Sequence, residues 1–284
     1  MVVAERLVSR SALVTGGASG LGAAIAHRLA TEGAHVFITD VDVDSGGALA
    51  EARGYTFILH DVTDEGGWNQ IVAEVETTAG RFDVLVNNAG ILGSRNSPDP
   101  EHAQLTDWRH VFAVNVEGVF LGCRAAIPAM RRAGGGSIIN ISSIAGLLAA
   151  PHAPAYGASK AAVHHLTTSV AQYCAKQGLN IRCNSVHPGN VRTPAWEEQA
   201  RSAAAERGVS FKAVLAEAEA CVPLGGFTDA ADVAAAVAFL ASEDARHITG
   251  TKLVVDGGVV GCSTFHFEAS MRCLSDPDHR DREP

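Results

Sequence analysis

The sequence predicts one α/β domain in which strands and helices alternate around a parallel, doubly wound sheet. Two observations carry this prediction: short runs rich in β-branched residues recur along the chain, and longer segments rich in Ala, Leu and Glu lie between them. Strands that alternate with helices favour right-handed crossovers and therefore parallel pairing. The 284 residues, of which 47% are hydrophobic, suffice for the core of one such domain.

Seven strands are expected at the β-branched runs, in chain order at residues 12–15, 35–39, 56–59, 84–86, 137–141, 181–186 and 252–255. Helices are expected in the segments between them, including residues 20–31, 68–79, 103–132, 158–177 and 230–241. In sheets of this kind, ligands bind beyond the carboxyl ends of the strands. Polar clusters at those ends are therefore the candidate sites.

Composition and charge exclude several classes of function. The net charge is −9 and the chain has no basic run that could follow a phosphate backbone, so nucleic acid is not an expected partner. The first 13 residues lack the apolar stretch of a signal peptide, and no later segment is expected to supply the roughly 18 apolar residues of a membrane span. A cytoplasmic protein without membrane contact is expected. The six cysteines and twelve histidines show no zinc-ligand spacing, so no metal site is predicted.

A glycine-rich turn follows the first expected strand and leads into the first expected helix. Its glycines are spaced GxxxGxG, and their missing side chains would let backbone N–H groups and the helix dipole meet a phosphate. This is the place of the pyrophosphate in a Rossmann-like fold, and the predicted contacts are Gly16, Ser19, Gly20, Leu21 and Gly22. Taken alone the turn is weak evidence, because tight turns also need glycine for structural reasons.

Acidic residues at the ends of the second and third strands extend the cofactor prediction. Asp40 lies 18 residues after Gly22, where a carboxylate can accept hydrogen bonds from both ribose hydroxyls. It would repel the 2′-phosphate of NADP, and neither the glycine-rich turn nor Val41 offers a compensating cation, so NAD is predicted. Asp61 is placed to bond the adenine amino group and Val62 to pack on the ring. Asp61 could equally cap the next helix.

Two amides and two small residues close the fourth strand. They suit the close approach of a ribose, although the same tetrapeptide is also a turn signal. The predicted cofactor contacts here are Asn87, Asn88, Ala89 and Gly90.

Tyr156 and Lys160 are the strongest candidates for catalysis. Four residues apart on one helix, they share a face, so the ammonium can act on the phenol. Lowering a tyrosine pKa from about 10 to about 7 takes roughly 4 kcal/mol, which the ammonium and a positive nicotinamide ring could supply. Tyr156 would then take the hydroxyl proton of an alcohol as hydride leaves its carbon. Ser143 would hold the substrate oxygen.

Asn115 lies within the expected helix 103–132, which is a poor position for an amide side chain. It could order a water molecule linked to Lys160. A solvated or capping role for Asn115 is the open alternative.

In combination, these motifs resemble the short-chain dehydrogenase/reductase family, of the shorter single-domain type. The resemblance covers about residues 7–258 and rests on TGxxxGxG, NNAG, an Asn, a Ser, YxxxK and a later Pro-Gly. It implies four catalytic residues, Asn115, Ser143, Tyr156 and Lys160. Ser143 is preferred to Ser142 because it stands 13 residues before Tyr156. The resemblance also implies a homotetramer, and further cofactor contacts from Tyr156, Lys160, Pro188, Gly189, Val191 and Thr193.

Residues 1–258 are expected to form the catalytic domain, in which residues 190–227 correspond to the family's substrate lid. The lid carries Trp196, Phe211, Val214 and Leu215, which suit an apolar pocket wall or, equally, an amphipathic helix packed on the core. Segments 59–62, 119–123 and 176–188 are similar to bacterial hydroxysteroid dehydrogenases. A bulky secondary alcohol such as a hydroxysteroid, or its ketone, is therefore the expected substrate.

Two features depart from the family's pattern. Arg192 could reach an acidic substrate group or point to solvent. Residues 259–284 extend beyond the usual end of family chains, and the last ten, almost all polar, are expected to be disordered. Three apolar residues of this tail could dock on a neighbouring subunit, namely Phe265, Phe267 and Met271.

Other functions stay open at this stage. A 3-oxoacyl-thioester reductase is the main rival, although such reductases mostly use NADPH and Asp40 argues against that cofactor. A dehydrogenase of an aromatic or cyclic alcohol or of a dihydrodiol is a further alternative. A module that senses the cofactor without turnover is disfavoured by the complete Asn, Ser, Tyr and Lys set.

Overall fold

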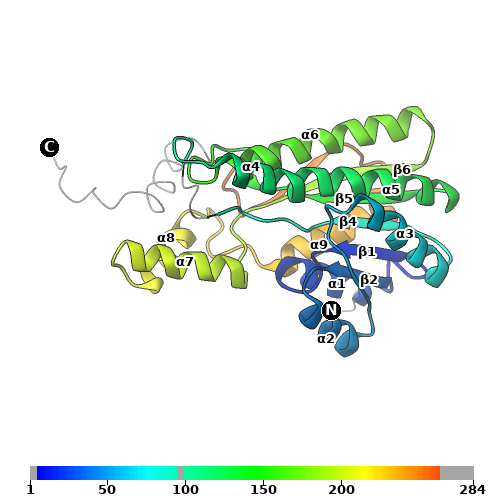
Figure 1. Cartoon of the computed structure of the whole chain (residues 1–284), viewed down its shortest axis with the longest axis horizontal. Helices are drawn as coiled ribbons and strands as arrows, with labels where there is room; N and C mark the ends of the chain where they lie inside the picture. The colour runs from blue at the N-terminus through cyan, green and yellow to red at the C-terminus, as the bar shows by residue number, and fades with distance from the viewer. Residues whose placement is uncertain (1–4, 95–98, 263–284) are drawn as a thin grey trace.

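The computed structural model describes residues 5–94 and 99–262, and it confirms the predicted parallel sheet (Figure 1). Seven parallel strands are ordered β3-β2-β1-β4-β5-β6-β7. Their bounds are β1 Ser11–Thr15, β2 His35–Asp40, β3 Thr56–Leu59, β4 Val84–Asn87, β5 Gly136–Ile141, β6 Ile181–Pro188 and β7 Lys252–Val255. The strand order reverses between the neighbouring strands β1 and β4, and in open sheets of this type ligands bind at that point.

The helices lie between the strands, as predicted. Their bounds are α1 Gly20–Thr31, α2 Val43–Arg53, α3 Glu65–Ala79, α4 Leu105–Phe112, α5 Gly118–Arg132, α6 Pro154–Lys176, α7 Pro194–Glu206, α8 Phe211–Ala220 and α9 Ala230–Ala241, with short turns η1 Ala113–Glu117, η2 Ile144–Gly146 and η3 Glu243–Ala245. Helix α2 was not among the named predictions. It begins after Asp42, whose side chain accepts a hydrogen bond from the Ser45 N–H and so caps the helix.

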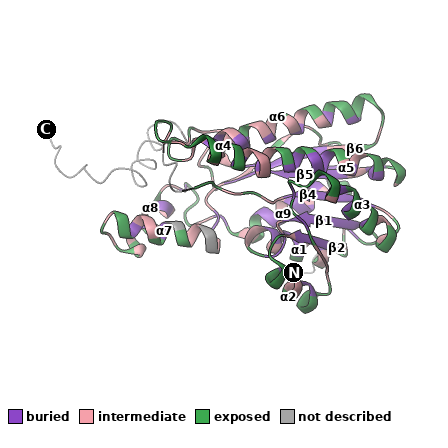
Figure 2. Ribbon diagram, viewed as in Figure 1, coloured by how far each residue is buried: buried purple, intermediate pink, exposed green. Residues whose placement is uncertain are grey.

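Two apolar clusters cover the two faces of the sheet. One cluster joins the sheet to α1, α2 and α9. The other joins it to α3, α5 and α6, with Trp68 and Phe82 fully buried. Figure 2 shows the strands buried and the outer surfaces of α5 and α6 exposed. Helices α7 and α8 project to one side of these layers (Figure 1).

The run Leu105–Arg132 corrects one expectation. By length and composition alone these 28 residues could cross a membrane, with a mean hydropathy of 1.4 in their most apolar window. Among the described residues this is the one such helix, and 44% of that window is buried inside the molecule. Val119, Ala126 and Met130 from this run belong to the core cluster shared with α3 and α6. Packing against the sheet therefore accounts for its apolar character.

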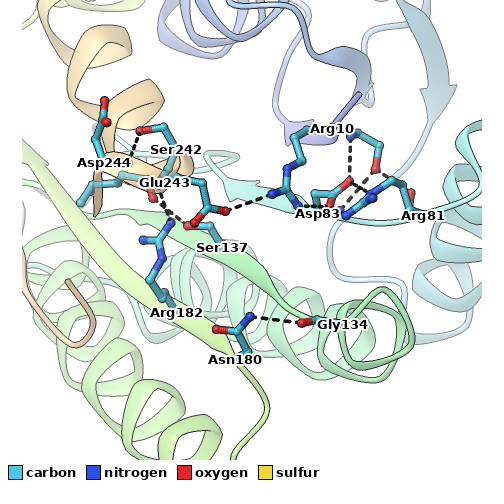
Figure 3. A network of polar contacts seen from close by, with 12 residues as sticks. Arg10, Arg81, Asp83, Gly134, Ser137, Asn180, Arg182, Ser242, Glu243 and Asp244 are labelled. Carbon is cyan, nitrogen blue, oxygen red and sulfur yellow. Dashed lines mark hydrogen bonds and ion pairs between the residues drawn. The ribbon is translucent and has the colours of Figure 1, made fainter. Parts of the chain in front are cut away.

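A polar network lies at the amino ends of strands β1 and β4, whereas the predicted site lies at the carboxyl ends of the strands (Figure 3). Asp83, immediately before β4, accepts hydrogen bonds from Arg81 at 2.6 Å, from Arg10 at 3.0 Å and from the Ser11 N–H at 3.0 Å. Arg10 also reaches Glu243 at 3.0 Å. Burial works to raise the pKa of Asp83, but the bonds from Arg81, Ser11 and Arg10 prevail and lower it. The network ties β1, β4 and the turn after α9 together.

The expected boundaries of the catalytic domain and lid are not tested by this fold. The last ten residues of the chain and the three apolar tail residues, Phe265, Phe267 and Met271, lie outside the described residues.

Replacing Asp83 by Asn is expected to lower the free energy of unfolding at about pH 7 by about 3 kcal/mol, because the arginines lose a buried carboxylate. Since the folded pKa lies below the usual 3.8, this contribution is present above pH 3.8 and is lost as pH falls through the folded pKa. The variant should therefore converge with the wild type in acid. Urea unfolding of both proteins at about pH 7 and in acid measures the difference in their free energies of unfolding.

Asp244→Asn is the control, because Asp244 is 60% exposed and pairs with Arg6 at the surface. Its cost should stay within about 0.5 kcal/mol. Equal effects of the two substitutions would contradict a special role for Asp83.

Candidate active site

The parallel sheet brings most of the predicted site residues together at the carboxyl ends of its strands. The carboxyl ends of β1, β2, β4, β5 and β6 lead into the glycine-rich turn, Asp40, residues 88–90, Ser143 and residues 189–193, respectively. Because all seven strands run the same way, these ends meet at the same side of the sheet.

The glycines of the first turn have separate roles. A Cβ on Gly22 would collide with the Gly16 carbonyl, and one on Gly16 would lie 2.8 Å from Ala89 Cα. Gly16 and Gly22 therefore allow close packing of α1 on the turn and on β4. Gly20 has φ +52°, and a Cβ there would meet only Thr193, at 3.8 Å, among the described residues. The amino end of α1 thus faces open space bordered by Thr193.

Ser19 and Leu21 flank that space. Ser19 is the N-cap residue of α1, but its hydroxyl does not cap the helix and is available to a phosphate. Leu21 lies in the first turn and packs against the core cluster with α9.

Asp40 lies directly beside the glycine-rich turn. Its Oδ2 accepts a hydrogen bond from the Ala18 N–H at 3.0 Å, and its Oδ1 accepts from the Val41 N–H at 2.8 Å. The carboxylate is therefore fixed between the end of β2 and the turn. Because these bonds come from backbone donors, no cation balances its charge at these contacts.

Asp61 does not cap α3, so that alternative falls to Asp64. Asp64 is the N-cap residue and accepts from the Gly66 N–H. Asp61 Oδ1 accepts from the N–H and hydroxyl of Thr63, at 2.9 and 2.8 Å, and the backbone bond is the main cause of its lowered pKa. Val62 is buried against Gly118.

The side chain of Asn87 is not brought to the site. It is buried between β4 and β5 and donates to Asn140 Oδ1 at 2.8 Å. The predicted ribose contact by this side chain is therefore corrected. Asn88 Nδ2 donates to the carbonyls of Thr15 and Gly16, at 2.9 and 3.0 Å, and so joins β4 to the glycine-rich turn.

Ala89 and Gly90 make the remaining contacts of this segment. The Ala89 N–H donates to Thr15 Oγ1 at 3.1 Å. A Cβ on Gly90 would lie 3.2 Å from both Asn115 Oδ1 and Lys160 Nζ. Gly90 therefore places the end of β4 against two members of the predicted catalytic set.

Lys160 is buried, with 4% of its surface exposed. Its Nζ donates to the Ile141 carbonyl at 3.0 Å and lies 5.5 Å from the centre of the Tyr156 ring. Burial lowers the pKa of Lys160 to about 8. Burial also raises the pKa of Tyr156 above its usual value, and a hydrogen bond with Ser143 offsets only part of that rise. The three predicted catalytic groups thus meet.

The structure separates the roles of the two adjacent serines. Ser143 caps the short turn η2, where its Oγ accepts from the Ala145 N–H at 3.1 Å and also bonds with Tyr156. Ser142 is buried and donates to the Lys160 carbonyl at 2.8 Å. Ser143 is therefore the serine beside the phenol.

Asn115 is fully buried in the π turn η1, so a solvated role is excluded. Its Oδ1 accepts from the Ile91 N–H at 2.8 Å, and its Nδ2 donates to the Ile91 carbonyl at 2.9 Å and to Ser159 Oγ at 3.0 Å. Ser159 in turn donates to the Tyr156 carbonyl at 2.7 Å. The sequence analysis missed Ser159, although its position directly before Lys160 was a signal.

The segment after β6 is held from several sides. Pro188 is the last residue of β6, and Gly189 lies so close to Asp256 that a Cβ would be 2.9 Å from Asp256 Cα. Val191 forms an isolated parallel bridge with Thr228. Thr193 caps α7 by accepting from the Trp196 N–H at 3.2 Å.

Arg192 pairs with Glu197 at 2.7 Å, and Arg201 pairs with the same carboxylate at 2.9 Å. The Arg192 side chain is 51% exposed, which agrees with the alternative that it points to solvent, and its partner there is Glu197.

The two lid helices pack mainly on each other. Ala200, Ala204 and Val214 form a small buried cluster, with Trp196 and Phe211 against it. Trp196 also contacts the Phe227 ring edge-on at 4.5 Å. Three of the four predicted pocket-wall residues therefore belong to a local core of α7 and α8.

Comparison with known proteins agrees with this geometry. A family profile described as enoyl-(acyl carrier protein) reductase matches residues 16–260. The NADP-dependent (R)-specific alcohol dehydrogenase of Lentilactobacillus kefiri is 38% identical over 89% of this chain and 98% of its own. The trans-4-hydroxycyclohexanecarboxylate dehydrogenase of Sinomonas cyclohexanicum is 40% identical over 90% and 95%. The 3-beta-hydroxysteroid dehydrogenase of Comamonas testosteroni is 39% identical over 90% and 98%. On this evidence the chain belongs to the short-chain dehydrogenase/reductase family.

Proposed function

We propose that this protein is an NAD-dependent dehydrogenase that interconverts a bulky secondary alcohol and its ketone. The observation that carries the proposal is the burial of Lys160 beside Tyr156, with Ser143 bonded to the same phenol. This arrangement holds one proton donor and acceptor between a cation and a hydroxyl. It is the arrangement that reversible alcohol oxidation requires.

Each residue of the set has a defined task. Tyr156 takes the proton from the alcohol hydroxyl and returns it in the reverse direction. Lys160 is an ammonium below about pH 8, so it stabilises the phenolate in a site of low dielectric constant. Ser143 donates to the substrate oxygen, and Asn115 fixes the π turn against Gly90 and Ser159. A bound nicotinamide supplies the hydride acceptor.

The residues at the strand ends fit a nicotinamide dinucleotide. The amino end of α1 presents backbone N–H groups to the open space over Gly20, which suits a pyrophosphate. In this proposal Asp40 binds the ribose hydroxyls, Asp61 and Val62 bind the adenine, and Val191 and Thr193 border the nicotinamide. The carboxylate of Asp40 favours NAD over NADP, although one relative is named as NADP-dependent.

The relatives support the substrate class. By name they act on a hydroxysteroid, a hydroxycyclohexane acid and (R)-alcohols, and two of these three substrates are alicyclic secondary alcohols. We propose a hydroxysteroid or a comparable cyclic alcohol as the substrate, with residues 190–227 as its lid. A homotetramer is the proposed assembly, supported by the exposed Phe120 on α5.

Replacing Tyr156 by Phe should lower alcohol oxidation by about 1,000-fold or more, because the proton acceptor is lost. The affinity for NAD should change less than about twofold. The assay follows reduced nicotinamide absorbance with 3β-hydroxysteroids, cyclohexanols and (R)-alcohols. Tyr173→Phe is the control, because Tyr173 is an exposed tyrosine on the same helix. Wild-type activity in the Tyr156 variant would refute its role.

Replacing Lys160 by Met should abolish turnover and yet stabilise the fold at about pH 7. A folded pKa of about 8 against 10.5 means that burial of the ammonium costs on the order of 3 kcal/mol below pH 8. Between pH 8 and 10.5 the unfolded chain binds a proton that the folded chain lacks, so wild-type stability rises there. The advantage of the variant should therefore shrink across that window.

Urea unfolding at about pH 7 and pH 10 measures this difference. Lys176→Met, an exposed position on the same helix, is the control and should change neither activity nor the pH dependence. A Lys160 variant that is less stable than the wild type by the same amount at both pH values would contradict the charge-burial argument.

Replacing Asp40 by Asn keeps a hydrogen-bond acceptor for Ala18 and removes the charge. Two unit charges about 4 Å apart repel by about 4 kcal/mol at a dielectric constant near 20. The wild type should therefore favour NAD over NADP in kcat/KM by about 100-fold or more. Asp40→Asn should narrow that ratio by about tenfold or more, mainly through NADP, whereas Asp42→Asn should not. Equal use of both cofactors by the wild type would rule out this specificity.

A further inference from the structure

A chain of buried polar side chains runs from α6 through β6 to the turn that carries Ser143. His187, near the end of β6, has no exposed surface. Its Nδ1 lies 3.1 Å from the Ser143 carbonyl oxygen, and its Nε2 lies 2.9 Å from Ser185 Oγ. His164 Nδ1 on α6 lies 3.2 Å from the same hydroxyl. None of these three side chains has a task in the reaction described above.

The positions of the protons on these side chains follow from the last acceptor in the series, the Ser143 carbonyl. A carbonyl can only accept, so His187 must carry a proton on Nδ1. Burial lowers the pKa of His187 to about 4, so the ring is neutral and Nε2 is an acceptor. The Ser185 hydroxyl lies 2.9 Å from Nε2 and 3.4 Å from the Thr251 carbonyl, so it donates to the nearer Nε2 and accepts from His164 Nδ1. All three donors point toward Ser143, which strengthens each bond by mutual polarisation.

The orientation of the Ser143 carbonyl affects the position of the Ser143 hydroxyl. It also accepts from the Gly146 N–H at 3.0 Å, inside the short turn between β5 and α6. The hydroxyl of the same residue accepts from the Ala145 N–H and bonds with Tyr156. A rotation of the Ser143 peptide plane would therefore move the hydroxyl relative to the phenol. His187 holds that plane from the neighbouring strand.

We propose that His187 is a positioning residue, which keeps the Ser143 hydroxyl against Tyr156 by holding the Ser143 carbonyl. The inference rests on the proposed function of this site and adds to it a residue that touches neither substrate nor cofactor. The Ser143 carbonyl sets the tautomer of His187, Ser185 holds the ring at Nε2, and His164 orients Ser185. The arrangement resembles the way in which an orienting group fixes the tautomer of an imidazole at many catalytic sites.

The test compares His187→Leu, which removes the donor, with His187→Asn, whose amide N–H can replace Nδ1–H. Because the bond with Ser143 lowers the pKa of Tyr156, losing the position of Ser143 should raise that pKa by about one unit in the Leu variant. The Asn variant should titrate near the wild type. The chain has three tyrosines, so phenolate absorbance, with Tyr156→Phe as the baseline, isolates the titration of Tyr156 with and without NAD.

Kinetics supply a second readout. The Leu variant should lose about tenfold in kcat at about pH 7 while its NAD dissociation constant stays within about twofold, and Asn should restore kcat. A purely structural role would lower the melting temperature and both kinetic constants without shifting the phenol titration. If the Leu variant does not fold, Ser185→Ala decides, because it removes the bond that holds the His187 ring at Nε2 and should shift the titration in the same direction.

The outcomes separate this inference from the proposed function. An unchanged titration and an unchanged kcat in His187→Leu, or in Ser185→Ala where Leu does not fold, would overturn the positioning role. The titration needs no substrate. A shifted titration in a protein that oxidises none of the alcohols would support the role of His187 and refute the proposed reaction alone.

Discussion

The site depends on one costly arrangement, an ammonium buried against a phenol. Lys160 gives up solvent and in exchange donates a hydrogen bond to the Ile141 carbonyl at 3.0 Å. Such a cation lowers the stability of the fold, and this explains why so much of the surrounding structure is devoted to holding it. Gly90, Asn115 and the Ser142 bond to the Lys160 backbone all restrict where the amine can lie.

The amino ends and the carboxyl ends of the strands have different tasks. At the amino-terminal edge, Arg10, Arg81 and Asp83 form a dense ionic network that ties β1 to β4. At the carboxyl edge the contacts are mostly backbone N–H groups, amides and hydroxyls, which leave acceptors and donors for a ligand. A parallel sheet favours this separation, because its strands all present the same end to the same side. Rigidity at one edge supports preorganisation at the other.

The π turn and the hydrogen-bonded side chains of His187 and Ser185 both hold the pair formed by Tyr156 and Ser143. Asn115, in the turn before α5, donates to Ser159 on α6, and Ser159 donates to the Tyr156 carbonyl. His187 and Ser185 reach Ser143 from β6. The phenol and its serine partner are thus each held through their main chains, and their hydroxyls bond with each other. Backbone anchoring of this kind fixes geometry without using the reactive atoms.

The sequence by itself determined the elements and the pairs that local periodicity controls. All seven strands follow from runs of β-branched residues, the glycine-rich turn from the spacing of its glycines, and the shared face of Tyr156 and Lys160 from their spacing of four residues. None of these signals depends on distant partners. The edge of the sheet at which the site assembles also follows, because alternation of strands and helices implies parallel strands.

Only the tertiary structure decided where individual side chains point. Asn87 turns to Asn140 on β5, Arg192 pairs with Glu197, Asp64 rather than Asp61 caps α3, and a π turn interrupts the helix around Asn115. Likewise, His187 gains its role from Ser143, 44 residues away in the chain. The physical reason is that a polar side chain takes the direction in which its hydrogen bonds are satisfied, and those partners come from elements that only folding brings together.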